Sequence, residues 1–405
     1  MRGLDDICLR DILSRAIGSE RAEVAVAAFH EPASVSVRIN PFKVDDPEGF
    51  AKEHFCGDIQ KVQWSPYGFL LAERPKFTLD PLFHCGCYYV QDSSAMAVGS
   101  IFRNILSTCE DCSRPVRVLD LCAAPGGKST DLAASLREAY GDNFILVSNE
   151  VMRSRASVLA DNMALWGDPN VVVTSVDPKA FARLEGFFDI IVTDVPCSGE
   201  GMFRKDAKAV EDWSEGTVNL CSTRQKRILA DVWPSLRRGG ALIYSTCTFE
   251  EAENDAILEW SAAELGGDIY EYDYQSLPDV IPTRTGGLLV PGFVKGEGQF
   301  VSALVKGTGT NGFRLSGKPA VGATEKRKGN LLIHIPGAIS REVTVLEPLH
   351  PILAGVANGE LRGRDLVPSA DWALSIALSG EEYPVAELDR ETALRFLHRD
   401  SIFLK

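Results

Sequence analysis

Two of the ten cysteines stand where they could carry out covalent chemistry. Cys197 lies in DVPCSGEG and Cys247 in YSTCTF, each just beyond an apolar segment. A cysteine after a buried strand is commonly a small apolar side chain, and for either residue alone that is the simpler interpretation. Two thiols at neighbouring strand ends, with Asp194 close to the first, favour a thiolate nucleophile.

Four carboxylates close consecutive apolar segments: Asp120, Glu150, Asp177 and Asp194. One such residue alone is explained as the N-cap of a following helix. An acid at the end of the second strand of an α/β sheet can also accept hydrogen bonds from ribose hydroxyls. Four acids in succession around a Gly-Gly turn predict a site for an adenosine-containing ligand.

The turn itself lies in LDLCAAPGGKST, residues 119–130, and ends like a phosphate-binding loop. The P-loop pattern G-x-x-x-x-G-K-[ST] requires a glycine where this chain has Cys122, and the dinucleotide pattern G-x-G-x-x-G is absent. We therefore expect a loop that cradles a ligand other than a triphosphate. Its residues are Cys122, Ala123, Ala124, Pro125, Gly126, Gly127 and Lys128.

The elements that position these residues alternate between strand and helix from residue 116 onward. Apolar segments at 116–121, 144–150, 170–177, 187–197 and 241–249 are separated by helical patterns. This order predicts a parallel sheet with helices on both faces, which binds ligands beyond the strand carboxyl ends. Residues 1–110 form a first segment of helices and short strands, 308–329 a Gly-, Thr- and Lys-rich linker, and 330–405 a final segment.

Composition narrows the class of protein. With 405 residues, 45% hydrophobic and 24% charged, the chain is expected to be a globular protein of several domains. It has no apolar run of membrane-spanning length and no signal-peptide pattern, so we expect a cytoplasmic protein without a membrane partner. The formal charge of −14 restricts polyanion binding to local patches such as Arg204-Lys205 or Lys326-Arg327-Lys328.

A metal site receives little support from the cysteine spacing. Cys85-x-Cys87 and Cys109-x-x-Cys112 could supply four thiolates to zinc, but a C-x-C beside a single C-x-x-C is a weak zinc signal. Free thiols are the simpler interpretation for a reducing compartment. We expect no metal.

Several segments together resemble the NOL/NOP/Sun family of S-adenosylmethionine-dependent RNA (cytosine-5) methyltransferases. They are DLCAAPGGKST, TDVPCSGEGMFRKD, YSTCTFEEAENDAI, SVRINPFK, GCYYVQDSSAM and GEGQFVSALVK, which span about residues 30 to 307. LVPSADWALS and ALRFLHRDSI more loosely resemble the appended PUA-like RNA-binding domain of the bacterial branch that methylates small-subunit ribosomal RNA.

The resemblance implies a fold and an organisation. Residues 111–307 would be a Rossmann-like class I methyltransferase core with a mostly parallel seven-stranded sheet. Residues 1–110 would be a small α+β, ferredoxin- or RRM-like RNA-binding segment, and 330–405 a PUA-like domain. We expect a monomer whose partner is RNA, most simply ribosomal RNA or a ribosomal subunit.

It also implies roles in catalysis. Cys247 would add to C6 of the cytosine, and Cys197 would assist the elimination that removes the C5 proton. Asp194 would hydrogen-bond the base, and Lys128 would orient the base or Asp194. Lys128 and Arg204 are also candidates to lower the pKa of the Cys247 thiol.

For the cofactor, S-adenosylmethionine, the resemblance places the methionine part against the loop from Cys122 to Lys128. Glu150 would hold the ribose hydroxyls and Asp177 the adenine amino group, while Asp194 would border the sulfonium. In the first segment, Arg38, Asn40 and Lys43 are candidates for RNA contact, with a solvated strand face as the alternative.

Two positions depart from the family pattern, and three rival functions remain. Gln299 stands where an aromatic residue is commoner, and Pro178 follows Asp177 where a small residue is commoner. A tRNA methyltransferase of the same chemistry and a non-catalytic RNA-binding assembly factor are alternatives. A DNA cytosine-5 methyltransferase is disfavoured, because its E-N-V triplet is absent and a second cysteine in TCT would have no role.

Overall fold

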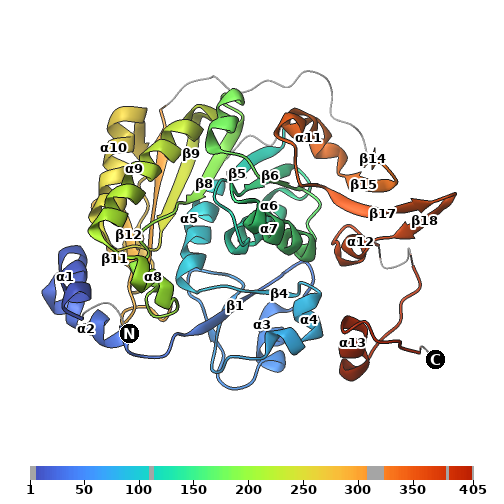
Figure 1. Ribbon diagram of the computed structural model, residues 1–405, viewed down its shortest axis with the longest axis horizontal. Coiled ribbons are helices and arrows are strands. Elements are labelled where there is room, and N and C mark those ends of the chain that lie inside the picture. The colour runs from blue at the N-terminus through green and yellow to red at the C-terminus, as the bar shows by residue number, and fades with distance from the viewer. Residues whose placement is uncertain (1–5, 109–113, 308–322, 380–382, 404–405) are drawn as a thin grey trace.

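The computed structural model describes residues 6–108, 114–307, 323–379 and 383–403 (Figure 1). Its centre is a ten-stranded mixed sheet in the order β11-β12-β13-β9-β8-β5-β6-β7-β16, with β10 also paired to β13. Its main strands are β5 (Val116–Asp120), β6 (Phe144–Asn149), β7 (Val171–Thr174), β8 (Phe188–Asp194), β9 (Leu236–Thr246) and β13 (Gln299–Lys306).

The five strands β5 to β9 are parallel, as the alternating pattern predicted. The sheet has ten strands rather than the expected seven, because short antiparallel strands extend both sides. They are β10 (Gly267–Ile269), β11 (Ile281–Pro282), β12 (Gly286–Leu289) and β16 (Leu353–Ala354).

Side chains that alternate along the parallel strands build two separate cores, one on each face of the sheet. Val118 packs with α5, α6 and α7, whereas its neighbour Leu119 packs with α1, α2, α9 and α10. The helices concerned are α1 (Asp6–Ile17), α2 (Ser19–Phe29), α5 (Ala97–Leu106), α6 (Gly127–Tyr140), α7 (Arg153–Trp166), α9 (Glu215–Val232) and α10 (Asp255–Leu265). The helices α1, α2 and α5, although in the first segment, therefore belong to the cores of the large sheet.

A smaller α+β unit with its own core lies between α2 and α5. Its antiparallel sheet has the order β2-β3-β1-β4, and its apolar side chains form a third core around Tyr88. Its elements are β1 (Val35–Ile39), α3 (Pro47–His54), β2 (Gln60–Lys61), β3 (Gly68–Leu71), α4 (Pro81–His84) and β4 (Tyr88–Val90).

The last part of the chain forms a four-stranded antiparallel sheet that packs on the core. Its elements are β14 (Thr324–Lys328), β15 (Leu331–Ile335), α11 (Ser340–Leu346), β17 (Val356–Arg362), β18 (Asp365–Pro368), α12 (Ala370–Leu374) and α13 (Arg390–Leu397). β14 falls within the stretch expected to be a linker. A buried ion pair of 3.0 Å joins Arg117 of β5 to Glu342 of α11, and β16 pairs with β7. In Figure 1, α11 and α12 accordingly lie beside the green part of the core, whereas α13 lies near α4.

Within the described residues, no helix is both long and apolar enough to cross a membrane. The same residues contain no cluster of three or more His, Cys, Asp or Glu side chains arranged to hold a metal ion. Cys109 and Cys112 of the weak zinc pattern lie outside the described residues.

Candidate active site

The glycine-containing loop connects β5 to α6 at the carboxyl edge of the sheet. Gly126 has φ 114°, a left-handed conformation that favours glycine. A Cβ added to Gly127 would lie 3.2 Å from the Tyr89 ring, so the small residue allows the first segment to approach closely. Ala123 donates its N–H to the carbonyl of Asn149 at 2.8 Å, which ties the loop to the end of β6.

The carboxylates predicted from the sequence lie where β5, β6 and β8 end. Asp120 is fully buried, accepts a hydrogen bond from Ser129 Oγ at 2.6 Å, and has its pKa raised to about 7 by burial. Glu150 is 4% exposed and accepts the Met152 N–H at 3.0 Å.

These carboxylates surround one thiol. Burial, followed by the negative charges of Asp120, Asp194 and Glu150, raises the pKa of Cys122 to about 12. Three carboxylates therefore act on the same small space beside the loop.

Asp177 is in a different environment. Its side chain is half exposed and caps the short helix η3 (Pro178–Arg183) by accepting the Lys179 N–H at 3.0 Å. The capping role that competed with adenine binding is thus present, and Pro178 occupies the first position of that helix, where its lack of an N–H is harmless.

Asp194 and Lys128 form the charged pair of the site. Lys128 Nζ lies 2.8 Å from Asp194 Oδ2, and Ser245 Oγ donates to Asp194 Oδ1 at 2.7 Å. Burial opposes charge on Lys128, but the Asp194 carboxylate outweighs it and raises the Lys128 pKa. Gln299 also donates to Asp194 Oδ1, at 3.4 Å, so this departure from the family pattern lies in direct contact with the site.

The two cysteines are brought together as the sequence predicted. Their Sγ atoms are 3.2 Å apart as free thiols, because β8 and β9 are adjacent parallel strands and the cysteines follow their ends. The Cys247 N–H also points at Cys197 Sγ, at 3.3 Å. The hydrogen bond with Cys247, together with burial, raises the pKa of Cys197 well above its ordinary value. Cys197 is therefore a neutral thiol at physiological pH, suited to exchange a proton.

Sequence reasoning missed a buried polar group behind Cys197. Ser198, Glu200, Gln225, Thr248 and Glu253 are all at most 7% exposed and hydrogen-bond to one another. The signal available was SGE after the cysteine and the acidic run EEAEND, which resembles a solvated surface.

Arg38 and Asn40, two of the RNA-contact candidates of the first segment, are buried, so they form neither an RNA-contact surface nor a solvated strand face, while Lys43 is half-buried. Arg38 is fully buried and donates to Gly127 O at 3.0 Å, to Gln91 and to Thr130. Asn40 donates to Trp166 O at 3.1 Å, and Lys43 to Leu165 O at 2.7 Å. All three join the first segment to the core.

Arg204 is engaged with a carboxylate other than those at the strand ends. It is buried and forms an ion pair of 2.9 Å with Glu297, and Lys205 pairs with Asp92 at 2.6 Å. The Arg204-Lys205 patch is therefore neutralised within the protein. Lys326, Arg327 and Lys328 are exposed on β14.

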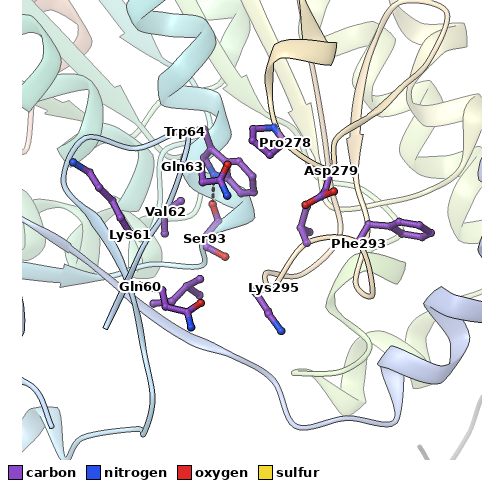
Figure 2. A pocket seen from close by; sticks show the side chains of 12 residues that line it. Gln60, Lys61, Val62, Gln63, Trp64, Ser93, Pro278, Asp279, Phe293 and Lys295 are labelled. Carbon is purple, nitrogen blue, oxygen red and sulfur yellow. Dashed lines mark hydrogen bonds between the residues drawn. The ribbon is translucent and has the colours of Figure 1, made fainter. Parts of the chain in front are cut away.

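A separate cavity of about 220 Å³ opens between the first segment and residues 278–295 (Figure 2). Trp64, whose Nε1–H donates to Ser93 O at 2.6 Å, forms part of its wall. Lys61 and Lys295 are exposed at its edge. The residues predicted for catalysis and cofactor binding do not line this cavity, so it is distinct from the strand-end site.

The parallel sheet, the glycine loop and the strand-end acids define a Rossmann-like methyltransferase fold. The family model for 16S rRNA methyltransferase RsmB/F matches residues 110–263, and that for the N-terminal domain of 16S rRNA methyltransferase RsmF matches residues 12–93. The chain therefore carries an RsmB/F-type methyltransferase domain and an RsmF-type N-terminal domain, which confirms the resemblance. Neither model extends to residues 324–403, and a PUA-like domain there stays a prediction.

Curated relatives carry the same family name. The chain is 33% identical to Ribosomal RNA small subunit methyltransferase F of Salmonella arizonae over 321 residues, which are 75% of this chain and 62% of the relative. The protein of that name from Aeromonas hydrophila is 33% identical, over 75% of this chain and 64% of the relative. The chain thus spans about three fifths of the length of these relatives.

Solved structures share the fold. A methyltransferase homolog protein from Pyrococcus horikoshii matches with a TM-score of 0.60 and 25% identity, over 73% of this chain and 93% of that one. NSun6 from the same organism, solved with SFG, matches with a TM-score of 0.60 and 18% identity, over 74% of this chain and 98% of that one.

Proposed function

We propose that this protein transfers a methyl group from S-adenosylmethionine to C5 of a cytosine in RNA. The observation that carries the proposal is the pair of thiols 3.2 Å apart beside the Asp194–Lys128 pair. One thiol can attack while the other remains protonated, and both lie at the strand ends where this fold binds ligands. The names of the relatives favour small-subunit ribosomal RNA as the substrate.

The strand-end residues fit the cofactor. Asp120 Oδ1 is buried without a hydrogen-bond partner in the described part of the chain, and three carboxylates converge beside the loop. Such a site favours a cationic ligand over the triphosphate of a P-loop. The loop from Cys122 to Lys128 would hold the methionine part, Glu150 the ribose and Asp177 the adenine. When bound, S-adenosylmethionine supplies an electrophilic methyl group.

The chain's own residues account for the remaining chemistry. The Cys247 thiolate adds to C6 of the base, which leaves C5 electron-rich and able to accept the methyl group. Asp194, held by Lys128 and Ser245, hydrogen-bonds the base and stabilises the charge that develops in the adduct. Cys197 then assists removal of the C5 proton, which passes to solvent. The electrons of the C5–H bond form the C5=C6 double bond, the C6–S bond breaks, and its electron pair returns to Cys247. The base must be unpaired or flipped for this attack.

Docking of the surrounding RNA is assigned to exposed basic residues. The candidates are Lys326, Arg327 and Lys328 of β14 and the cavity-edge residues Lys61 and Lys295. Arg38, Asn40, Lys43 and Arg204 are instead engaged in hydrogen bonds or an ion pair within the protein. Phosphate contacts of this kind fix register without reading sequence.

The test is methyl transfer from labelled S-adenosylmethionine to ribosomal RNA, small subunits, tRNA and DNA. Cys247→Ala and Cys197→Ala are run in parallel, with Cys56→Ala, an exposed thiol, as the control. We expect 5-methylcytosine from the wild type and the control, none from Cys247→Ala, and a stalled covalent RNA adduct from Cys197→Ala.

The other outcomes distinguish the rivals. A stalled adduct in Cys247→Ala would reverse the cysteine roles. Transfer to tRNA or to DNA would identify the corresponding alternative substrate. Absence of transfer to every substrate, with RNA binding intact, would favour a non-catalytic assembly factor.

A further inference from the structure

The buried group behind Cys197, here the Ser198 cluster, consists of Ser198, Glu200, Gln225, Thr248 and Glu253. Its members come from the loop after β8, from α9 and from the loop after β9, so it joins the two strand ends that carry the cysteines. None of them belongs to the cofactor or base-binding residues assigned above. The cluster is nonetheless directly bonded to the residues on both sides of Cys197.

Those bonds fix the backbone around the thiol. The Ser198 N–H donates to the Glu253 carboxyl at 3.1 Å. Gln225 Nε2 donates to Pro196 O at 3.0 Å and to Glu253 Oε2 at 2.8 Å. The Glu253 carbonyl in turn accepts from Tyr244 Oη at 2.6 Å. Pro196 and Ser198, which flank Cys197, are therefore both held through one glutamate.

A count of the hydrogens available for these bonds indicates that one carboxyl group of the cluster is protonated. Ser198 Oγ lies 2.9 Å from Glu200 Oε1, 3.0 Å from Thr248 Oγ1, and also against Glu253 Oε1. The hydroxyl has a single hydrogen, so two ionised carboxylates would leave one acceptor facing another. One of the two carboxyls must be un-ionised.

A consistent assignment places that proton on Glu253. Thr248 Oγ1 accepts the Glu250 N–H at 3.1 Å, and its own hydrogen is directed to Ser198 Oγ. Glu253 donates to the same oxygen, and Ser198 then donates to Glu200. Every hydrogen of this chain is used, and each lone pair of Ser198 Oγ accepts one bond.

The surroundings of Glu253 support the assignment. Burial, and then the charge of Glu200, raise the pKa of Glu253 to about 7. The titratable groups that act on it or respond to it are Glu200, Cys197, Cys221 and Tyr244. Within the described residues, no basic side chain forms an ion pair with Glu253. An anion at Glu253 would therefore lack a compensating positive charge.

We propose that un-ionised Glu253 is a positioning residue that holds Cys197 in the orientation needed to release the methylated base. This inference rests on the proposed function. Ionisation of Glu253 would break its donation to Ser198 and loosen the loop. We therefore expect adduct release by the wild type to slow as the pH rises above about 7.

The experiment compares Glu253→Ala and Glu253→Gln with the wild type, using Glu251→Gln, an exposed neighbour, as the matched control. Formation and release of the RNA adduct are followed in single turnovers from pH 6 to 9, after thermal unfolding confirms that each variant is folded. We expect Glu253→Ala to form the adduct within threefold of the wild-type rate and to release it at least tenfold more slowly. Glu253→Gln, whose amide can donate to Ser198 Oγ, restores release and removes its decline at high pH.

The proposal would be overturned if Glu253→Ala released the RNA adduct at the wild-type rate. It would also be overturned if Glu253→Gln folded but released the adduct as slowly as Glu253→Ala. A second readout does not depend on RNA: alkylation of each thiol by iodoacetamide, resolved by mass spectrometry. We expect Glu253→Ala to change the rate at Cys197 at least threefold and leave Cys56 unchanged. If the wild type forms no adduct, the proposed function fails, and unchanged Cys197 alkylation would then reject the positioning role separately.

Discussion

Asp120 makes the stability of the protein depend on pH in a direction that can be calculated. Its side chain is fully buried at the end of β5, where it accepts from Ser129, and its second oxygen has no partner among the described residues. Burial raises its pKa from 3.8 to about 7. Between these values the folded protein retains a proton that the unfolded chain has released.

The sign and size of the effect follow from linkage. The stabilising contribution is fully present below the unfolded pKa of 3.8 and is lost as the pH rises through about 7. The free energy of unfolding should decrease by up to about 1.4 kcal/mol per pH unit, and by about 4 kcal/mol over the full range. That is a large share of the roughly 5–15 kcal/mol expected for a folded protein.

Asp120→Asn should remove this contribution, because the amide is neutral at every pH and keeps an acceptor for Ser129. Urea unfolding of the cofactor-free protein at pH 5, 6, 7 and 8 measures the difference. Glu253, whose pKa is also raised, makes the free energy of unfolding fall with pH in both proteins, so its contribution cancels when the two are compared. Asp161→Asn, an exposed site on α7, serves as the control and should parallel the wild type. Equal slopes for Asp120→Asn and the wild type would refute the reasoning.

Three further predictions concern the contact between the first segment and the core, the cofactor site and the site of the target base. Arg38→Met should destabilise the fold by about 3 kcal/mol or more, because the buried oxygens of Gly127 and Gln91 lose the guanidinium as a hydrogen-bond donor. A thermal scan with an unchanged Tm would contradict this prediction. Asp177→Ala should raise the Kd for S-adenosylmethionine about tenfold, measured by calorimetry, whereas a purely capping role predicts an unchanged Kd. Gln299→Leu should reduce kcat less than tenfold and Asp194→Asn more than a hundredfold, since the Gln299 bond is long; comparable losses in the two variants would argue against this ranking.

The sequence was informative wherever one rule of parallel sheets applied. Strand carboxyl ends meet at a common edge, so acids and thiols that follow apolar segments were predicted to lie together. The structure confirms this for Asp194, Cys197 and Cys247. The position of the glycine loop followed from the same rule, and the absence of the first P-loop glycine argued against a triphosphate ligand.

Other features depend on partners that are remote in the chain. Glu253 lies in an acidic run that resembles a surface, and only Gln225, 28 residues away, and Ser198 show it to be buried. Arg38 lies in an alternating strand whose apparent outer face is covered by α6. β14 consists of exposed polar residues and has no apolar alternation, so it was read as linker. Short edge strands such as β10 have too few residues to show an alternation of apolar and polar side chains, so the sequence did not predict them.

The Arg38 contacts have a consequence for how the protein can be divided. The guanidinium reaches from β1 into the first turn of α6, where it bonds the carbonyl of Gly127 and the hydroxyl of Thr130. A chain shortened to begin at residue 111 would retain every side chain proposed for catalysis but would expose that carbonyl and leave an empty space beside the glycine turn. We therefore expect the segment from residue 111 onward to be less stable when it is produced alone. The loop before α6 depends on a hydrogen bond from an arginine that lies more than 80 residues upstream in the chain.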